Sequence, residues 1–157
     1  MDDRETLVGL ISDTHGLVRP QAIDALRGSD LIIHAGDIGK LEVIDQLRAV
    51  APTIAVRGNV DGQAWAAEFP MTEAVTVGQL VLWVLHEISQ LDLDPAAAGF
   101  AAVVFGHSHQ PSIETREGVL YINPGSAGPR RFKLPVTVAR VSITGREIRP
   151  EIIILDV

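Results

Sequence analysis

The chain has 157 residues, of which 46% are hydrophobic, with no cysteine and a formal net charge of −7. This length suits one domain, residues 1–157, and the lack of cysteine excludes disulfides and thiolate metal sites. The negative charge is unfavourable for binding extended nucleic acid, no apolar run is long enough to cross a membrane, and the acidic start does not resemble a signal peptide. We therefore expect a cytoplasmic protein without membrane contacts, and we leave a homo-oligomer open.

The first third of the chain alternates short apolar runs with amphipathic segments. This alternation favours strands that are joined by helices, and hence a parallel sheet with right-handed crossovers. The expected strands are 6–12, 30–36 and 53–59, and the expected helices are 19–28 and 40–51.

The rest of the chain is predicted to be mostly β-structure. A hairpin over 73–86 turns at Gly78 and Gln79, and a short helix over 91–99 precedes a buried strand over 101–106. Alternating β-branched residues predict three more strands, at 118–123, 136–143 and 147–157. The expected fold class is α/β, with two mixed sheets packed face to face and helices outside them.

Polar residues follow the apolar runs, at the points where the strands are expected to end. In open α/β sheets, ligands bind at the carboxyl ends of the strands, where loops bring distant side chains together. The residues at these ends are two aspartates, one asparagine and four of the five histidines: Asp13, His15, Asp37, Asn59, His86, His107 and His109.

Each of these residues, taken singly, has an ordinary structural interpretation. A histidine beside a strand often only satisfies its hydrogen bonds, and aspartate or asparagine often forms a turn. The joint pattern is poorly explained in this way and predicts a metal site. Seven ligands are too many for one ion, whereas two ions about 3.5–4 Å apart that share a carboxylate suit phosphoester hydrolysis.

The order of these residues along the chain resembles the calcineurin-like metallophosphoesterases. The family's motifs D-x-H, G-D, G-N, H and G-H-x-H correspond to Asp13 to His15, Gly36-Asp37, Gly58-Asn59, His86 and Gly106 to His109. The short length and the N-P-G-S run at 123–126 look most like the small microbial phosphodiesterase branch of that family. The resemblance spans residues 8 to about 131.

The resemblance implies a four-layer α/β/β/α sandwich and a binuclear metal centre. It assigns Asp13, His15 and His109 to one ion, Asn59, His86 and His107 to the other, and Asp37 to a bridging position. A hydroxide that bridges the ions would attack phosphorus in line. Manganese is the expected metal because the ligands combine imidazole and oxygen without sulfur, and nickel, zinc, iron or magnesium remain possible.

The residues expected to act in catalysis are Asp37, Asn59, His107 and Arg130. Arg130 follows Pro129 in a loop that relatives place over the metals, so it either grips a phosphate or, like Arg131, is an ordinary surface charge. His34 lies within a strand, and we expect it to pack or to support a ligand rather than bind a metal.

Two departures from the family pattern fall beside expected ligands. Many relatives carry a histidine thought to protonate the leaving group where this chain has Val60, so we expect a preference for good leaving groups, such as aryl phosphodiesters. Asp61 either orients a neighbour or forms a turn, and the turn is preferred. The family's H-G-H is replaced by His86-Glu87-Ile88; Glu87 either narrows the access to the site and makes it more acidic, or turns outward, which is preferred.

The sequence therefore predicts a metal-dependent phosphodiesterase that acts on a small phosphodiester or nucleotide-type substrate. Two alternatives stay open. One is a phosphomonoesterase, and the other is a weak or inactive scaffold for protein–protein interaction, since the family's fold also occurs in a retromer subunit that works mainly by protein contacts. The enzyme is favoured because all seven ligand positions hold residues that can bind a metal.

Overall fold

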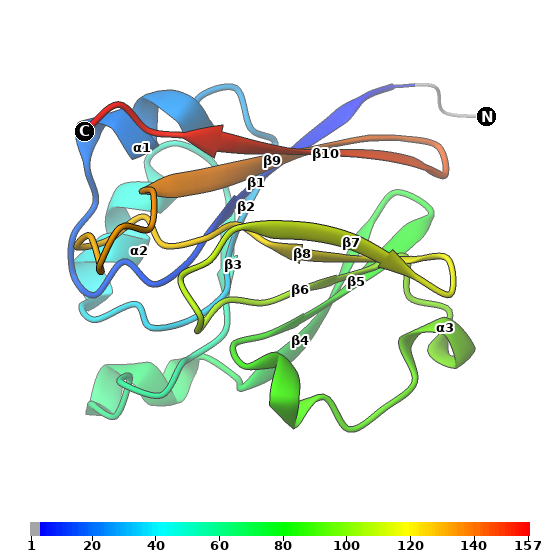
Figure 1. Ribbon diagram of the computed structural model, residues 1–157, viewed down its shortest axis with the longest axis horizontal. Helices are drawn as coiled ribbons and strands as arrows, with labels where there is room; N and C mark the ends of the chain where they lie inside the picture. Colours follow the sequence, from blue (N-terminus) through cyan, green and yellow to red (C-terminus); the bar gives the residue numbers. More distant parts are fainter. Residues whose placement is uncertain (1–3) are drawn as a thin grey trace.

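The strands of the computed structural model, which describes residues 4–157, form two five-stranded sheets (Figure 1). The first sheet consists of β1 (Thr6–Ile11), β2 (Leu31–His34), β3 (Thr53–Ala55), β9 (Thr137–Thr144) and β10 (Glu147–Ile154). Its order is β10-β9-β1-β2-β3. The strands β1, β2 and β3 run parallel, and β9 is antiparallel to both β1 and β10, so the sheet is mixed.

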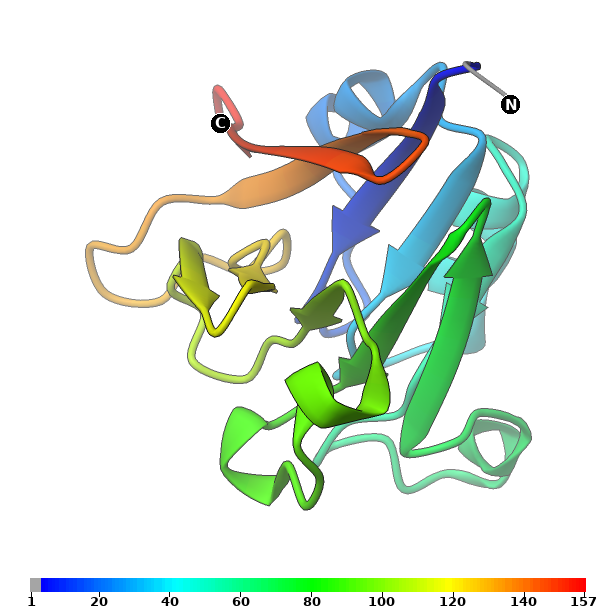
Figure 2. The ribbon, with the colours of Figure 1, turned by 90° about the vertical axis from the view of Figure 1, so that its right-hand side faces the viewer.

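The second sheet is also mixed and comes from the middle of the chain. It consists of β4 (Thr72–Val77), β5 (Leu80–Leu85), β6 (Ala102–Val104), β7 (Ser112–Arg116) and β8 (Val119–Asn123). Its order is β4-β5-β6-β8-β7, with β5, β6 and β8 parallel and an antiparallel strand at each edge. Figure 2 shows the two sheets as separate layers.

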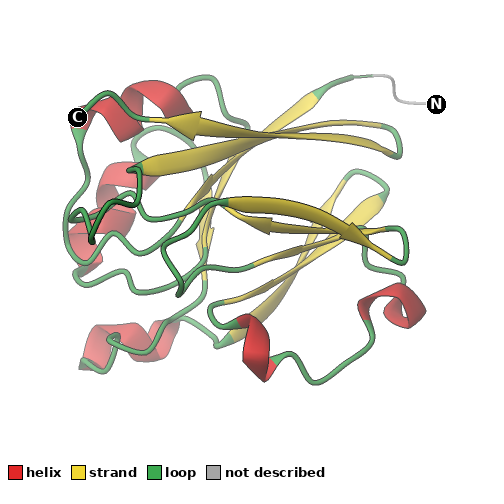
Figure 3. Cartoon of the chain, in the orientation of Figure 1, coloured by secondary structure: helices red, strands yellow, loops and turns green. Residues whose placement is uncertain are grey.

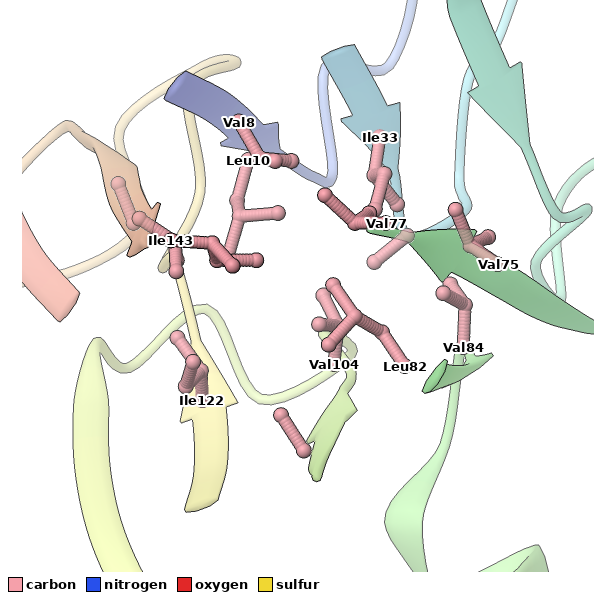
Figure 4. Packing of buried hydrophobic residues seen from close by; sticks show 14 of the residues in the cluster. Val8, Leu10, Ile33, Val75, Val77, Leu82, Val84, Val104, Ile122 and Ile143 are labelled. Carbon is pink, nitrogen blue, oxygen red and sulfur yellow. The ribbon is translucent and has the colours of Figure 1, made fainter. Parts of the chain in front are cut away.

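The main core lies between the two sheets. Val8 and Leu10 alternate with residues that face the other side of β1, as the two-residue period of a strand requires. In Figure 4 they converge with Val84 and Val104 from the second sheet. Burial of one such side chain stabilises the fold by about 1.5–3 kcal/mol, so this layer is a main source of the attraction between the sheets.

The helices cover the outer faces unequally (Figure 3). The first sheet carries α1 (Pro20–Leu26) and α2 (Leu41–Arg48), whose Leu26, Ile44 and Leu47 are fully buried. The outer face of the second sheet carries only the short η2 (Ile88–Gln90) and α3 (Pro95–Ala98), with Phe100 stacked on Trp83 at 5.2 Å. The remaining 3-10 helix is η1 (Ala64–Glu68).

The predicted α/β class with two mixed sheets is confirmed, and the differences lie in the details. The expected helix over 91–99 is limited to Pro95–Ala98, and the strand over 53–59 ends at Ala55. Strand β7 has no sequence signal because this edge strand is exposed along most of its length and lacks an apolar face. The 3-10 helix η1, which follows the Asn59 loop, was not predicted either.

Two consequences of this architecture matter for function. The parallel strands of both sheets send their carboxyl ends to one end of the sandwich, where the loops carry the polar residues singled out above. In addition, none of the helices between residues 4 and 157 combines the length and apolarity that crossing a bilayer needs.

Candidate metal centre

The seven predicted ligands come from five loops. Asp13 and His15 follow β1, Asp37 follows β2 and Asn59 follows β3 in the first sheet. In the second sheet, His86 follows β5, and His107 and His109 follow β6. The centre is therefore built from both sheets.

Asp13 is the central carboxylate of this arrangement and is fully buried. Its Oδ2 accepts hydrogen bonds from Ser12 Oγ at 2.6 Å and from the main-chain N–H of His107 at 3.1 Å. Its Oδ1 accepts none, although the Nε2 atoms of three histidines lie nearby: His109 at 3.4 Å, His86 at 3.8 Å and His15 at 3.9 Å. One oxygen is thus fixed to the protein frame, and the other faces the histidines.

Asp37 repeats this division between its two oxygens. Oδ1 accepts the main-chain N–H of Val60 at 3.1 Å, while Oδ2 lies 3.2 Å from Nε2 of His86 and 3.7 Å from Nε2 of His15. The Nδ1–H of His86 donates to the main-chain oxygen of Ala35 at 2.8 Å. In the neutral ring, Nε2 therefore carries a lone pair that is directed at two carboxylates.

These residues fit a divalent cation. Three buried atoms that face one another, Asp13 Oδ1, His15 Nε2 and His86 Nε2, have no hydrogen-bond partner in the described part of the chain. Buried polar atoms are rarely left unpaired, and acceptors that face acceptors are satisfied by a positive ion between them. Two sets have ligand atoms within 4.8 Å of one another: Asp13, His15 and His109, and Asp13, Asp37 and His86.

The remaining two predicted ligands lie at the solvent side. Asn59 is exposed, the side chain of His107 is 43% exposed, and Asn59 Nδ2 lies 3.4 Å from His107 Nδ1. The other ring nitrogen of His107, Nε2, lies 3.5 Å from Oε1 of Glu87. The preferred expectation that Glu87 turns outward is therefore corrected: its carboxylate faces Nε2 of a predicted ligand, whose Nδ1 faces Asn59.

The backbone of the ligand loops is unusual. Five of the seven residues have positive φ: Asp13 (55°), His15 (47°), Asp37 (56°), His107 (72°) and His109 (65°). Such conformations cost of order 1–3 kcal/mol each for residues other than glycine, and they cluster at functional sites. Hydrogen bonds between loops hold them in place, for example from the N–H of Asp13 to Gly36 O and from the N–H of His15 to Asp37 O.

Two motif glycines are explained by close packing against the carboxylates. A Cβ atom on Gly58 would collide with the main-chain nitrogen and Oδ1 of Asp37, and one on Gly106 would collide with the side chains of Ser12 and Asp13. The glycines of the G-N and G-H motifs therefore let the loops of β3 and β6 approach the carboxylates. This is a packing requirement, since neither residue has positive φ.

Asp61 supports the centre through the backbone. Its buried carboxylate accepts the N–H groups of Ile38, Gly39 and Gly58 at 3.0, 2.9 and 2.8 Å. It thereby ties the loop of Asp37 to the loop of Asn59. The preferred expectation of a simple turn residue is too narrow, because only Gly58 is a local partner.

His34 is a support and not a ligand. Its Nδ1 accepts the N–H of Gly36 at 3.0 Å, so Nε2 carries the proton and lies 2.9 Å from Thr14 Oγ1, which donates to Ile38 O. Complete burial lowers the pKa of His34 to about 3, with a smaller contribution from His86. The ring therefore stays neutral and links the loops of β1 and β2.

Residues of the N-P-G-S run hold the second sheet's loop. Asn123 donates to Gly106 O at 3.2 Å and to Ser108 Oγ at 3.1 Å, and Ser126 Oγ donates to Asp13 O at 3.1 Å. Roles for Asn123, Ser126 and Ser12 were not predicted from the sequence. Their position beside the ligand motifs was the available signal.

Charges around the buried carboxylates shift their protonation. Burial raises the pKa of Asp13, and the hydrogen bond from Ser12 offsets this in part. For Asp37 the effect of burial is outweighed by the nearby His86 ring and the hydrogen bond from Val60 N–H, which lower its pKa to about 2. Burial would lower the pKa of His86, but Asp37 and Asp13 raise it overall. The two carboxylates therefore favour positive charge at the position of His86.

The two arginines after Pro129 differ in what they contact. An Nη atom of Arg130 donates to the main-chain oxygen of Val157 at 3.4 Å. Burial lowers the pKa of His109, and the positive charge of Arg131 contributes to this shift. Arg131 is exposed, and a role of Arg130 in catalysis stays a prediction.

The comparisons with known proteins identify the class to which this fold and site belong. The family model of the calcineurin-like phosphoesterase superfamily domain matches residues 7–146, and the chain belongs to that superfamily. The resemblance read from the sequence is thereby confirmed.

Individual relatives agree with this assignment. The chain is 32% identical, over 94% of its length, to a probable metallophosphoesterase from Methanothermobacter thermautotrophicus, of which 91% is covered. A solved archaeal phosphodiesterase is 25% identical with a TM-score of 0.78, covering 94% of this chain and 100% of that one. Vps29 from Entamoeba histolytica, solved with Zn²⁺, has a TM-score of 0.74 at 19% identity, covering 96% and 100% of the two chains, and shows the fold alone.

Proposed function

We propose that the protein is a binuclear metal-dependent phosphodiesterase. The observation that carries the proposal is the set of unpaired buried atoms of Asp13, His15 and His86 that face one another in a metallophosphoesterase fold. One ion would be held by Asp13, His15 and His109 and the other by Asn59, His86 and His107, with Asp37 shared. This small, one-domain enzyme would act in the cytoplasm on a small phosphorylated substrate.

Bound divalent ions supply Lewis acidity and lower the pKa of a water molecule, which is the chemistry that phosphoester hydrolysis needs. The chain's own residues hold this arrangement in place before substrate arrives. Asp13 and Asp37 each fix one oxygen to main-chain N–H groups, and Ala35 fixes the tautomer of His86. Imidazole and oxygen ligands without sulfur favour Mn²⁺ and are compatible with Ni²⁺, Zn²⁺, Fe²⁺ and Mg²⁺.

The leaving group receives no proton from residue 60. Val60 is 48% exposed at the side of Asn59, and its side chain has no proton to donate. We therefore propose that aryl phosphodiesters, whose leaving groups need little protonation, are better substrates than alkyl diesters. Val60→His should raise the hydrolysis of an alkyl diester toward the 10²–10⁴-fold range typical of general acids. Unchanged alkyl diester turnover would contradict this explanation.

The decisive experiment measures metal content and turnover together. The protein is stripped with a chelator, reloaded with Mn²⁺, Ni²⁺, Zn²⁺ or Mg²⁺, and assayed on bis(p-nitrophenyl) phosphate and p-nitrophenyl phosphate. We expect about two ions per chain and faster turnover of the diester. Asp13→Asn should lose both properties, while Asp24→Asn, an exposed aspartate on α1, serves as the matched control.

The same experiment separates the alternatives. Faster turnover of the monoester would identify a phosphomonoesterase. Less than one bound ion per chain together with no turnover on either ester would reject the enzyme and favour a protein-interaction role.

A further inference from the structure

A cavity of about 200 Å³ opens beside the solvent side of the candidate metal centre. Two of the predicted ligands, Asn59 and His86, form part of its wall. A larger hollow, of about 430 Å³, lies between α1 and α2 and touches none of the predicted ligands. The smaller cavity is therefore the one that a group attached to a bound phosphate reaches first.

Outside the predicted ligands, four polar side chains line this cavity, one of which is Thr72 at the start of β4. The other three come from two separate segments. Arg57 comes from the loop after β3, and Gln90 and Asp92 come from the segment at the end of η2. The Arg57 side chain is half-buried, and across residues 4–157 it makes neither a hydrogen bond nor an ion pair. In the same part of the chain, the side chains of Gln90 and Asp92 are also unpaired, and Arg57 and Asp92 are not in ion-pair contact with each other. The cavity thus offers free donors and free acceptors together.

This combination selects the chemistry of the ligand. A hydroxyl group both donates and accepts, so adjacent hydroxyls satisfy a guanidinium, an amide and a carboxylate at once. Among residues 4–157, no Phe, Tyr or Trp lines the cavity, so the described part of the chain offers no stacking platform of the kind on which nucleobases usually bind. Its volume is also below the roughly 300–1,000 Å³ of pockets for drug-sized ligands.

We propose that this cavity binds the vicinal diol of the ester group that stays on phosphorus, in an arm of glycerol size. Arg57 donates hydrogen bonds to the hydroxyl oxygens, and Asp92 accepts hydrogen bonds from the hydroxyl groups. The amide of Gln90 can donate or accept, while Met71 and Leu85 contact the carbon chain. This inference rests on the proposed phosphodiesterase function. It adds a specificity subsite outside the metal ligands.

The test compares two aryl diesters that differ only in the hydroxyl groups, glyceryl p-nitrophenyl phosphate and propyl p-nitrophenyl phosphate, with Mn²⁺-loaded protein. In both, water adds to phosphorus as the bond to the nitrophenyl oxygen breaks, and nitrophenolate and an alkyl phosphate are released. We expect kcat/KM to be about tenfold higher for the glyceryl ester. Arg57→Met should bring this ratio near unity, and Asp92→Asn should lower it by a smaller factor.

Arg149→Met removes an exposed arginine of β10 and should leave the ratio unchanged. An adenosine 5′-ester and its 2′-deoxy counterpart distinguish a ribose diol from a glycerol diol: a larger ratio for that pair, lost in Arg57→Met, would support the diol site and assign it to ribose. Ratios near unity for both pairs in the wild type would overturn the inference.

Failure of the proposed function gives a different result, namely no turnover of any ester. In that case, calorimetry with glycerol 3-phosphate and propyl phosphate on the Mn²⁺-treated protein still decides. Tighter binding of glycerol 3-phosphate by about tenfold supports the diol site, and equal affinities overturn it.

Discussion

The predicted metal ligands form a buried group and an exposed group, and the two are built differently. Asp13, Asp37, His86 and His109 are buried, and hydrogen bonds from neighbouring loops fix the first three. Asn59 and His107 are exposed. The protein itself supplies the contacts that hold the buried group in position. We therefore expect one ion to bind tightly and the other to bind more weakly.

The largest expected effect comes from substitutions that test this division directly. Asp13→Asn removes a buried charge that three histidines face, and loss of one partner from such an arrangement costs about 3–5 kcal/mol, or roughly 10²–10⁴-fold in metal affinity. Asn59→Ala should instead release one ion and retain the other. Metal titration by calorimetry, with bound metal measured after dialysis, distinguishes these outcomes. Equal losses in the two variants would contradict the division.

A second substitution breaks the backbone support that both groups share. Asp61→Ala leaves three N–H groups without their acceptor, and unpaired buried donors cost about 1–3 kcal/mol each, reduced where water enters. We expect the free energy of unfolding to fall by about 3 kcal/mol in urea denaturation. Asp24→Asn, at an exposed site, should change it by less than about 0.5 kcal/mol. A loss for Asp61→Ala as small as that would show that the carboxylate is dispensable.

A third prediction concerns acid stability of the buried side in metal-free protein. The unfolded His34 takes up a proton near its ordinary pKa of 6.5, whereas the folded ring has a pKa of about 3. Between these values the unfolded state binds more protons, so stability falls as pH is lowered, by up to about 1.4 kcal/mol per pH unit. His34→Gln should flatten this slope between pH 6.5 and pH 4.

The range between pH 6.5 and pH 4 avoids the titration of Asp37. Its pKa is lowered from 3.8 to about 2, so the stability that it contributes is lost only at more acidic pH. Urea denaturation at several pH values checks the prediction. Parallel pH profiles for the wild type and His34→Gln would show that His34 does not control this transition.

The smallest effect is expected at Glu87, in the exposed group. Glu87→Gln removes the charge that faces Nε2 of His107, and loss of such a supporting carboxylate lowers metal affinity by about tenfold at the low end of the usual range. Because this pair is partly exposed, salt should reduce the difference between variant and wild type. Metal titrations at low and high ionic strength measure this difference in metal affinity. Loss of the tightly bound ion in Glu87→Gln would contradict this, because it would show that Glu87 supports the buried group of ligands.

Much of the fold and the candidate site follows from local patterns in the sequence. Apolar runs that end in aspartate, asparagine or histidine predicted both the strands and the residues that gather at their ends. Asp13, Asp37, His86 and His109 lie together because parallel strands share one edge. The expected layer of helices over the second sheet is thin, since the segment 91–99 contains only one short helix.

Other features depend on contacts between distant segments and leave no local signal. The charged residues of β7 pair along an edge and have no apolar periodicity. The direction of Glu87 depends on the loop of His107, and the partners of Asp61 include Ile38 and Gly39 from another loop. The partner of Arg130 is likewise distant in the sequence, because its side chain contacts Val157 at the other end of the C-terminal region.

The origin of the ligands in both sheets has a thermodynamic consequence. Ions bound between Asp13 and Asp37 on one sheet and His86 and His109 on the other would cross-link the two layers. A ligand that binds only the folded chain raises its stability by mass action, by about 2.7 kcal/mol at a hundred times its Kd. The melting temperature should therefore rise with metal concentration, and the supply of metal would set the resistance of the protein to unfolding as well as its activity.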